Sequence, residues 1–551
     1  MTAITATALT GGQALVQSLL REGVDTIFGI PGIQLDWAYD AIHAARGQIR
    51  VIHTRHEQAT AYMADGYARS TGRVGVYLVV PGPGVLNTTA ALSTAFACNS
   101  KVLCLTGQIQ SDLIDVGRGI LHEVDDQLGM LRHVTKWAAR ATAPSEIPAL
   151  VHEAFRQMHS GRPRPVMIEV PPDVLMASRD ARLGEPLAAE RSAPDPDAIE
   201  RAAELLGAAE RPLIVAGGGV QVAEAWPELR RLAELLGAPV AMTYNGLGSL
   251  PASHPLAFSF IGLPRLLPEA DAVLGVGSRL VQFPNRSVAP RPGAPFIRID
   301  VDGSQMYRGA PPTVPIVADA KLALAALVEA VERHNRQRPD RSAELAALKA
   351  EILDDINTLE PQASLGRALR DELPDDAIFV SESTQVGYWA QWGGWPAEHP
   401  RSFLTSGYQG TLGYGFPTAL GAQVGNPDRR VVSINGDGGF MFNVQELATA
   451  VQHEIPLTTI VFDDGAYGNV RRIQEHQFGG RTIASDLRNP SFAKLAEVFG
   501  MQGIRAEGPD NLRAALRAAA SHPGPTLIEV PVGPMPMILS HLQQRAAARL
   551  R

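Results

Sequence analysis

The sequence predicts an α/β protein of three domains, each built on a parallel sheet with helices on both faces. Short, apolar, β-branched stretches alternate with longer stretches of helical periodicity, which is the pattern of strand–helix–strand units. This pattern is interrupted by a Pro- and charge-rich stretch at 184–197 and by a polar stretch at 333–343. A chain of 551 residues also has the length of about three ordinary domains.

The alternation places the elements in order along the chain. In the first domain, 1–183, we expect helices and strands at Gly11–Arg21, Thr26–Gly29, Leu35–Ala45, Arg50–Thr54, Gln58–Ser70, Val74–Val80 and, after further units, Pro165–Glu169. In the central domain, 196–335, we expect strands at Pro212–Ala216, Ala272–Val276 and Phe296–Val301. In the third domain, 360–535, we expect strands at Val431–Ile434 and Leu457–Phe462. A tail, 536–551, is either helical or frayed.

Composition excludes several functional classes. The net charge of −8 and the lack of a basic stripe with interleaved aromatic residues argue against nucleic acid as a partner. No apolar run is long enough to cross a bilayer, and Met1–Gly11 lacks a basic region followed by an apolar core, so we expect a cytoplasmic protein. Cys98 and Cys104 are too few for a disulfide framework or a zinc cluster, and we expect both to be buried thiols.

The most informative segment is Asn435-Gly436-Asp437-Gly438-Gly439, followed by Asp463-Asp464-Gly465-Ala466-Tyr467-Gly468. Each part follows a predicted strand, and a right-handed crossover would bring the two strand ends together at one edge of a sheet. We expect Asn443 to cap the intervening helix, with Glu446 completing a capping box. Two carboxylates beside free glycine amides suit magnesium and a diphosphate. The alternative is a solvated acidic loop.

This segment resembles the thiamine-diphosphate signature of the 2-oxo-acid decarboxylases and carboligases, a family that includes acetolactate synthase and benzoylformate decarboxylase. The resemblance implies that Asp437, Asp464 and the carbonyl of Ala466 bind Mg²⁺. It also implies two cofactor-binding domains around a central nucleotide-binding-like domain. Asp463 and Asp464 stand where the family has two asparagines, which adds negative charge beside the diphosphate. The cofactor contacts implied here are Gly436, Asp437, Gly438, Gly439, Asp464, Ala466, Tyr467 and Gly468.

A glutamate in the family's first domain binds the aminopyrimidine ring of the cofactor and promotes loss of the thiazolium proton. The stretch from Arg55 to Gly72 resembles that region and places Glu57 between a strand and a helix. A carboxyl group desolvated there would have a raised pKa and could share a proton with the ring. The alternative is a glutamate that is merely favoured by the positive end of the helix dipole.

Four shorter segments resemble other cofactor contacts of the family. The Gly-rich turns among them are also compatible with ordinary strand–helix connections. In the third domain, Leu412 corresponds to the apolar wedge beneath the two cofactor rings, and the Gly410 carbonyl to the acceptor for the exocyclic amine. The remaining candidates are Pro31, Gly32, Gly84 and Asn87 in the first domain, and Thr384 and Gln385 as diphosphate contacts in the third.

The resemblance is weaker for the substrate pocket. Gln108 and Lys136 correspond to residues of the acetolactate synthase pocket, and His122 stands where that enzyme has a phenylalanine. A histidine could relay a proton near neutral pH, although a lone histidine in a loop is often structural. Three residues depart from the named enzymes and indicate that neither activity transfers intact: Ile33, Val80 and Ile473.

Some members of the family hold FAD in the central domain. Gly217–Gly219, Gly275–Arg279 and Asp300–Asp302 occupy positions that a nucleotide could use. Glycines after strands are weak evidence by themselves, and the expected Met-His-Gly segment is absent near Phe260–Pro264. We therefore regard FAD as the less favoured alternative.

These observations predict a thiamine-diphosphate- and Mg²⁺-dependent lyase or carboligase that acts on a 2-oxo acid or 2-hydroxyacyl substrate. Decarboxylation would give an enamine, which is protonated or added to a second carbonyl. Two alternatives stay open: a flavin-dependent 2-oxo acid oxidase, and a catalytically decayed cofactor-binding scaffold. In the family the site lies between the first domain of one subunit and the third domain of another, which implies a homodimer or homotetramer.

Overall fold

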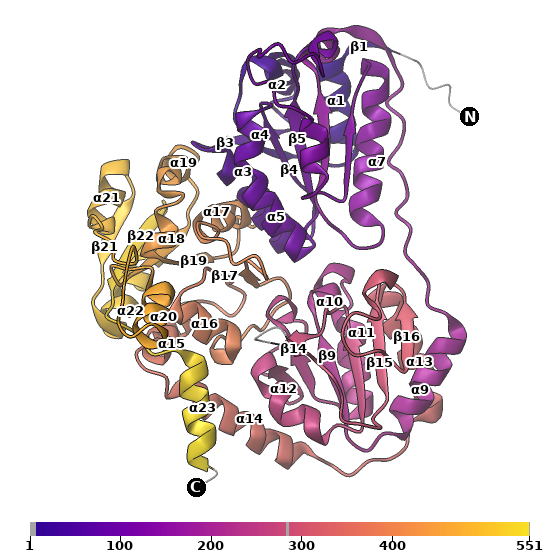
Figure 1. Ribbon diagram of the computed structural model, residues 1–551, viewed down its shortest axis with the longest axis vertical. Helices are drawn as coiled ribbons and strands as arrows, with labels where there is room; N and C mark the ends of the chain where they lie inside the picture. Colours follow the sequence, from indigo (N-terminus) through magenta and orange to yellow (C-terminus); the bar gives the residue numbers. More distant parts are fainter. Residues whose placement is uncertain (1–6, 283–285, 550–551) are drawn as a thin grey trace.

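A computed structural model describes residues 7–282 and 286–549 of the chain. Within these residues the chain forms three six-stranded sheets, and all pairings inside each sheet are parallel. Figure 1 shows the N-terminal domain at the top, the central domain at the lower right and the C-terminal domain at the left. The predicted three-domain α/β class is confirmed.

The N-terminal domain contains a sheet of strand order β3-β2-β4-β5-β7-β6. Its strands are β2 (Thr26–Gly29), β3 (Arg50–His53), β4 (Gly75–Val79), β5 (Val102–Gly107), β6 (Trp137–Arg140) and β7 (Val166–Val170). A two-stranded antiparallel sheet joins β1 (Thr7–Thr10) to β8 (Ser178–Ala181). The helices are α1 (Gly11–Arg21), α2 (Asp36–Ala44), α3 (Glu57–Thr71), α4 (Pro83–Asn87), α5 (Thr89–Cys98), α6 (Gln127–Leu131), α7 (Ile147–His159) and α8 (Pro172–Met176).

The central domain contains a sheet of strand order β11-β10-β9-β12-β15-β16. Its strands are β9 (Pro212–Ala216), β10 (Val240–Met242), β11 (Ala257–Ser259), β12 (Ala272–Val276), β15 (Phe296–Asp300) and β16 (Val314–Val317). A small hairpin consists of β13 (Val281–Gln282) and β14 (Arg286–Ser287). The helices are α9 (Pro196–Ala208), α10 (Gly218–Ala223), α11 (Trp226–Leu236), α12 (Leu263–Leu266) and α13 (Ala320–His334).

The C-terminal domain contains a sheet of strand order β18-β17-β19-β20-β22-β21. Its strands are β17 (Ile378–Ser381), β18 (Phe403–Thr405), β19 (Val431–Gly436), β20 (Thr458–Asp463), β21 (Gln502–Arg505) and β22 (Thr526–Pro531). The helices, from the connecting helix to the tail, are α14 (Ser342–Asn357), α15 (Gln362–Glu372), α16 (Gln385–Trp389), α17 (Gly415–Gly425), α18 (Asp437–Phe440), α19 (Leu447–Gln452), α20 (Gly468–Gln477), α21 (Phe492–Phe499), α22 (Gly508–Ser521) and α23 (Ile538–Arg549). The described part of the C-terminal tail is therefore helical from Ile538 to Arg549.

Continuous apolar strands explain why these sheets are covered on both faces. The strand β4 is buried at each of its five positions, and β5 at each of its six. A parallel strand buried on both faces needs an uninterrupted apolar run rather than strict alternation. Cys104 is buried in β5, as predicted, whereas Cys98 ends helix α5 and is only half-buried; both are free thiols.

The N-terminal and C-terminal domains are held together by helices α3 and α17, which cross closely at two glycines. A Cβ on Gly66 would lie 1.9 Å from the Thr418 carbonyl oxygen, and one on Gly421 would lie 1.9 Å from the Met63 carbonyl oxygen. Only glycine permits such an approach, so either substitution would force the helices apart. Among the described residues, no helix is long and apolar enough to cross a membrane.

The predicted capping box at Asn443 is wrong. Asn443 precedes a short 3-10 turn, Val444–Glu446, and its side chain makes no capping hydrogen bond there. Its amide instead donates to the Gly413 carbonyl at 2.7 Å. Glu446 does not reach back to Asn443 but accepts hydrogen bonds from the N-terminal domain. The spacing of Asn443 and Glu446 is that of a capping box, but both side chains form hydrogen bonds with residues distant in the sequence instead.

Candidate active site

Two neighbouring strands of the C-terminal sheet bring the predicted metal ligands to one edge. Strands β19 and β20 are paired, with Gly436 opposite Phe462, so Asp437 and Asp464 follow adjacent strand ends. Asp437 is only 2% exposed, whereas Asp464 is half-buried. The carboxyl edge of a parallel sheet is where such folds bind ligands.

Asn489 joins the two acidic segments. Its amide nitrogen lies 2.6 Å from Oδ2 of Asp437 and 2.8 Å from Oδ1 of Asp463. Burial raises the pKa of Asp437, the Asn489 hydrogen bond lowers it, and the Asp464 charge raises it further. Burial also raises the pKa of Asp464, against the effect of Arg472, which lies nearby. Clustered carboxyl groups of this kind are stabilised by a bound cation.

The turn residues fit a magnesium ion and a diphosphate. A Cβ on Gly438 would lie 2.7 Å from the Tyr467 ring, and one on Gly468 would lie 2.3 Å from Oδ2 of Asp464. Gly438 thus leaves room for the Tyr467 ring of the other loop, and Gly468 leaves room for the Asp464 carboxylate within its own loop. Within the described residues, no three His, Cys, Asp or Glu side chains are grouped to hold a metal. A set of two carboxylates and the Ala466 carbonyl is compatible with that finding and suits Mg²⁺.

The loop before α16 lies beside this turn. The methyl group of Thr384 would be 3.6 Å from a Cβ on Gly436, while the Thr384 hydroxyl accepts from the Gly387 amide at 2.8 Å. Gln385 contacts the side chain of Asn469, which follows Gly468, at 2.8 Å. Both candidate diphosphate contacts are thus near the metal ligands, although each already has a partner inside the chain.

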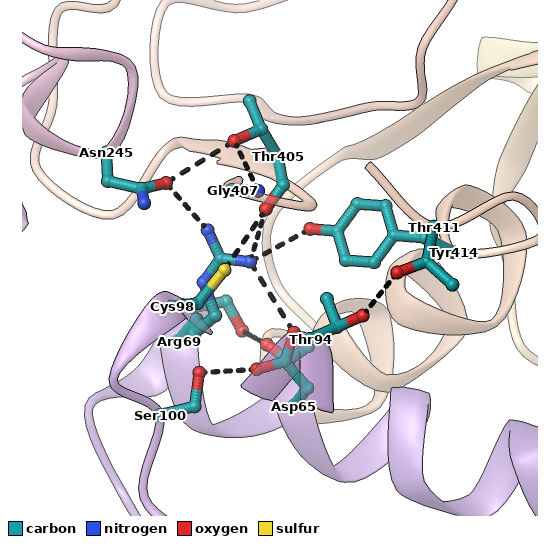
Figure 2. Close-up of polar contacts among 12 residues, drawn as sticks. Asp65, Arg69, Thr94, Cys98, Ser100, Asn245, Thr405, Gly407, Thr411 and Tyr414 are labelled. Carbon is teal, nitrogen blue, oxygen red and sulfur yellow. Dashed lines mark hydrogen bonds and ion pairs between the residues drawn. The ribbon is translucent and has the colours of Figure 1, made fainter. Parts of the chain in front are cut away.

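The segment with Gly410 and Leu412 is fixed at both ends by Arg69 of α3. One guanidinium nitrogen of Arg69 donates to the Thr405 carbonyl at 2.7 Å and to the Tyr414 hydroxyl at 3.0 Å. The other donates to Asn245 of the central domain at 3.4 Å, so this buried cation contacts all three domains (Figure 2). Leu412 is half-buried between these anchors, as an apolar wedge awaiting a cofactor would be.

Glu382 lies beneath the two turns of the C-terminal domain that are predicted to bind the cofactor. Its Oε1 accepts from the Gly413 amide at 2.6 Å, and a Cβ on Gly439 would lie 2.4 Å from the same atom. Its Oε2 is buried without a hydrogen-bond partner. Burial raises the pKa of Glu382 to about 8, although the Gly413 and Tyr414 amides lower it.

The N-terminal domain groups its own predicted residues around Glu57, the first residue of α3. The Asn87 amide donates to Oε2 of Glu57 at 3.0 Å. A Cβ on Gly84 would lie 3.8 Å from Oε1 of Glu57, and Val80 fills the space between Gly84 and Gly32. Within one chain Glu57 is half-buried and Pro31, next to Gly32, is exposed.

His122 belongs to the same group. The backbone of His122 packs against the turn that leads into α4, since its carbonyl oxygen would lie 2.5 Å from a Cβ on Gly82. Its Nδ1 lies 3.0 Å from Oε1 of Gln34, whose amide donates to the Leu121 carbonyl at 3.2 Å. His122 has a φ of +68°, so its loop backbone is strained, and its ring is half-buried.

The structure separates two other predicted pocket residues from this group. Gln108 follows β5 at the correct edge, but it is only 3% exposed, and its side chain contacts Glu169 and the Ile109 amide. Lys136 precedes β6 and therefore lies at the opposite edge of the sheet. Its ammonium donates to the Gln157 and Ser160 carbonyls. In this structure internal partners hold both side chains, and the predicted substrate contacts of Gln108 and Lys136 stay predictions.

Each half of the candidate site is surrounded by exposed apolar side chains. Near Glu57 these are Ile33, Leu86 and Leu121, of which Ile33 is 65% exposed. Near Asp437 and Asp464 they are Met441, Phe442, Val470 and Ile473, of which Val470 is 50% exposed. Clustered exposed apolar residues indicate a protein–protein contact.

The candidate nucleotide residues of the central domain also come together. They line a cavity of about 670 Å³ between the central domain, the N-terminal domain and the loop at Gly407 and Tyr408. Gly218, Gly277 and Asp300 are among its walls. The guanidinium of Arg279 stacks on the Tyr408 ring, with its carbon 4.0 Å from the ring centre.

Sequence reasoning missed four residues of the site: Gln34, Glu382, Asn489 and Arg472. Asn489 lies in a loop well after Asp463, and no local motif marks it. Glu382 precedes the predicted contacts Thr384 and Gln385 by two and three residues, but only the fold reveals that it is buried between two turns.

Comparison with known proteins bears directly on this geometry. Three family models match in order along the chain: thiamine pyrophosphate enzyme N-terminal TPP binding domain at 9–130, central domain at 199–327 and C-terminal TPP binding domain at 383–530. The chain belongs to the thiamine pyrophosphate enzyme family. Thiamine pyrophosphate is another name for thiamine diphosphate, so the predicted family is confirmed.

Relatives within the thiamine pyrophosphate enzymes match almost end to end. A probable acetolactate synthase large subunit from Methanocaldococcus jannaschii is 35% identical, over 96% of this chain and 93% of its own. A probable 2-ketoarginine decarboxylase from Pseudomonas aeruginosa is 36% identical, over 95% and 94%. The Escherichia coli acetolactate synthase isozyme 2 large subunit is 33% identical, over 95% and 96%.

This thiamine pyrophosphate enzyme is thus of the decarboxylase and carboligase class, as predicted. Bound thiamine diphosphate would supply an electron sink for the carbanion left when CO₂ departs. The matched models describe thiamine pyrophosphate binding, and none describes a flavin.

Proposed function

We propose that this enzyme decarboxylates a small 2-oxo acid with thiamine diphosphate and Mg²⁺, and then releases an aldehyde or joins the remaining acyl unit to a second carbonyl. The observation that carries the proposal is the position of Asp437 and Asp464 at adjacent strand ends, beside glycines that leave room for the Tyr467 ring and the Asp464 carboxylate. Asp437, Asp464 and the Ala466 carbonyl would hold Mg²⁺ and, through it, the diphosphate.

Glu57 is proposed to hold and release a proton at the aminopyrimidine ring of the cofactor. Asn87 orients its carboxyl group through the 3.0 Å hydrogen bond to Oε2. Leu412 would support the cofactor rings from below, and the Gly410 carbonyl would accept from the ring amine. His122, held by Gln34, is proposed to move a proton to or from the substrate oxygen.

The site requires a second copy of the chain. The Glu57 half and the Asp437 half lie in different domains, and each is surrounded by exposed apolar side chains. We propose that the N-terminal domain of one subunit covers the C-terminal domain of another, within a homodimer or homotetramer. That contact would also bury Glu57 and exclude water from the cofactor.

The substrate class is proposed from the relatives' activities. One relative is named a probable acetolactate synthase large subunit and another a probable 2-ketoarginine decarboxylase, and we propose a 2-oxo acid donor on that basis. Ile33 and Ile473 are exposed and Val80 packs against Gly32 and Gly84, and we propose that these three residues select the donor by shape.

A substrate panel tests this proposal. The purified enzyme, supplied with thiamine diphosphate and Mg²⁺, is mixed with 2-oxo acids that have aliphatic, aromatic and cationic side chains. CO₂ release and products are followed by mass spectrometry, and the absorbance spectrum reports any flavin. We expect CO₂ from at least one donor, and a rate lower by about 100-fold or more in Glu57→Gln. No turnover with any donor, or full activity in that variant, would contradict the proposal.

A further inference from the structure

The turn that carries Glu57 is held by the C-terminal domain of its own chain. This turn follows β3, an edge strand of the N-terminal sheet. Glu446 accepts from the Arg55 amide at 3.0 Å and from the His56 amide at 3.0 Å. These two amides immediately precede Glu57 in the sequence. Glu446 is fully buried, so water cannot replace its carboxylate as the acceptor for these amides.

Two residues at the end of α19 extend the contact along the same strand. Nε2 of His453 lies 3.1 Å from the His53 amide nitrogen, and the two imidazole rings meet edge to face. Oε1 of Gln452 accepts from the Arg55 guanidinium at 2.8 Å. Figure 1 shows α19 lying beside β3. Glu446, Gln452 and His453 together are called the α19 clamp below.

The chemistry of Glu446 suits it to hold main chain rather than to react. Its carboxylate also accepts from the Thr449 hydroxyl at close range, so amide and hydroxyl donors surround both oxygens. Without an acceptor there, two buried amides would lose their hydrogen bonds, and the turn would have to rearrange to recover them. The residue most affected would be the one that follows them, Glu57.

We propose that Glu446 is a positioning residue for Glu57, acting through the backbone of Arg55 and His56. This inference rests on the proposed role of Glu57 at the cofactor. Both carboxylate oxygens of Glu446 accept from donors of its own chain, so the proposed role acts on the backbone and not on the cofactor or substrate. By holding these amides, Glu446 fixes the position and orientation of the first turn of α3. It therefore fixes where the Glu57 carboxyl group meets the aminopyrimidine ring. A misplacement of about 1 Å at a reacting group can cost about 100-fold in rate.

The first test measures how strongly Glu446 protects the backbone amides before Glu57, and it does not depend on catalysis. In Glu446→Gln the side-chain NH₂ replaces one of the oxygens that face amide donors. We expect faster hydrogen–deuterium exchange, by about tenfold or more, in apoprotein peptides that cover 50–58. Glu454→Gln is the matched control, since Glu454 is an exposed carboxylate of the same segment. Unchanged protection in folded Glu446→Gln would overturn the inference.

The second test measures the consequence for the cofactor. The exchange rate of the thiazolium C2 proton of bound thiamine diphosphate is followed by acid quench and NMR. We expect Glu446→Gln to lower this rate by about 10- to 100-fold, to keep cofactor affinity within about threefold, and to leave the pH profile unshifted. Glu446→Asp, which keeps the carboxylate, should recover part of the rate. A normal rate in Glu446→Gln would overturn the inference.

Further variants separate this inference from the proposed function. If Glu57→Gln exchanges the C2 proton as fast as the wild type, the proposed role of Glu57 fails, whatever Glu446 does. If Glu446→Gln does not fold, His453→Phe removes the neighbouring contacts to His53 and should give a smaller loss of rate and of backbone protection. Wild-type rate and protection in His453→Phe, together with wild-type behaviour of Glu446→Asp, would then overturn the inference.

Discussion

Asn87 donates a 3.0 Å hydrogen bond to Oε2 of Glu57. Glu57 is the first residue of α3, and Asn87 is the last residue of α4 in the same domain. The bond leaves Oε1 of Glu57 free to meet a cofactor. It also gives the carboxyl group one preferred orientation, which a proton transfer requires.

Replacing Asn87 by leucine should therefore lower kcat more than it weakens cofactor binding. A hydrogen bond to a charged group contributes about 1.5–3 kcal/mol, which corresponds to a loss of about 10- to 100-fold in kcat. Steady-state kinetics at saturating thiamine diphosphate and Mg²⁺ measure this loss. Asn87→Asp is informative as well, because a second carboxylate beside Glu57 should lower activity further at neutral pH. A variant with wild-type kcat would show that the bond is not used.

Asp464 gives this site one more carboxylate than the asparagine usual in the family. Asp464→Asn should weaken Mg²⁺ binding by about tenfold, because a neutral oxygen replaces an anionic one, while activity at saturating Mg²⁺ persists. Asp437→Asn should be much more damaging, because Asp437 is buried and bonded to Asn489. Titration of cofactor-dependent activity with Mg²⁺ separates the two. Equal losses would argue against different roles for the two aspartates.

Glu382 should make the apoprotein sensitive to alkaline pH. Its folded-state pKa of about 8 lies above the ordinary value near 4.5, so the folded state binds the proton more tightly than the unfolded state. The stabilisation from this group is complete below the unfolded pKa and is lost as pH rises through about 8. Glutamine does not ionise, so Glu382→Gln does not lose this stability as the pH rises. Relative to the wild type, its free energy of unfolding should increase by an amount on the order of 4 kcal/mol between pH 5 and pH 9. Urea denaturation at several pH values measures the difference, and a gap independent of pH would contradict it.

Arg69 should be the most stabilising single residue at the junction of the three domains. Arg69→Met leaves Asp65 buried, bonded to Ser100 but without its cation, and removes the donors to Thr405 and Tyr414. We expect a loss of about 3–5 kcal/mol in the free energy of unfolding. The double variant Asp65→Asn, Arg69→Met should lose less, because no charge stays unpaired. Denaturation curves of the wild type, Asp65→Asn, Arg69→Met and the double variant form the cycle, and additive losses would exclude the pairing.

The fold was predictable because its signals are local. The strand boundaries at Thr26–Gly29, Pro212–Ala216 and Ala272–Val276 agree with the structure, since each is a short apolar run between turn residues. The candidate site was predictable where a motif sets backbone geometry, as at Asp437 and Glu57. It was not predictable where a side chain chooses a distant partner. Asn443 and Glu446 show this, since their spacing indicates a capping box but their partners are Gly413 and the backbone before Glu57.

Lys136 illustrates a second limit of sequence reasoning. The residue was placed by resemblance alone, whereas its position before β6 puts it at the amino edge of the sheet. The cofactor groups of the same domain follow the strands and lie at the carboxyl edge. Strand direction, not motif similarity, decides which residues can share a site.

The central claim is that Glu57 of one subunit and Asp437 of another serve the same cofactor. Two inactive variants, Glu57→Gln and Asp437→Ala, are co-expressed with different tags, and the mixed oligomer is isolated through both tags. A mixed dimer with shared sites contains one site built from intact Glu57 and intact Asp437, so activity should return to about a quarter to a half of the wild-type value. Sites confined to single chains would leave every site broken, and a mixed oligomer as inactive as its parents would contradict the account.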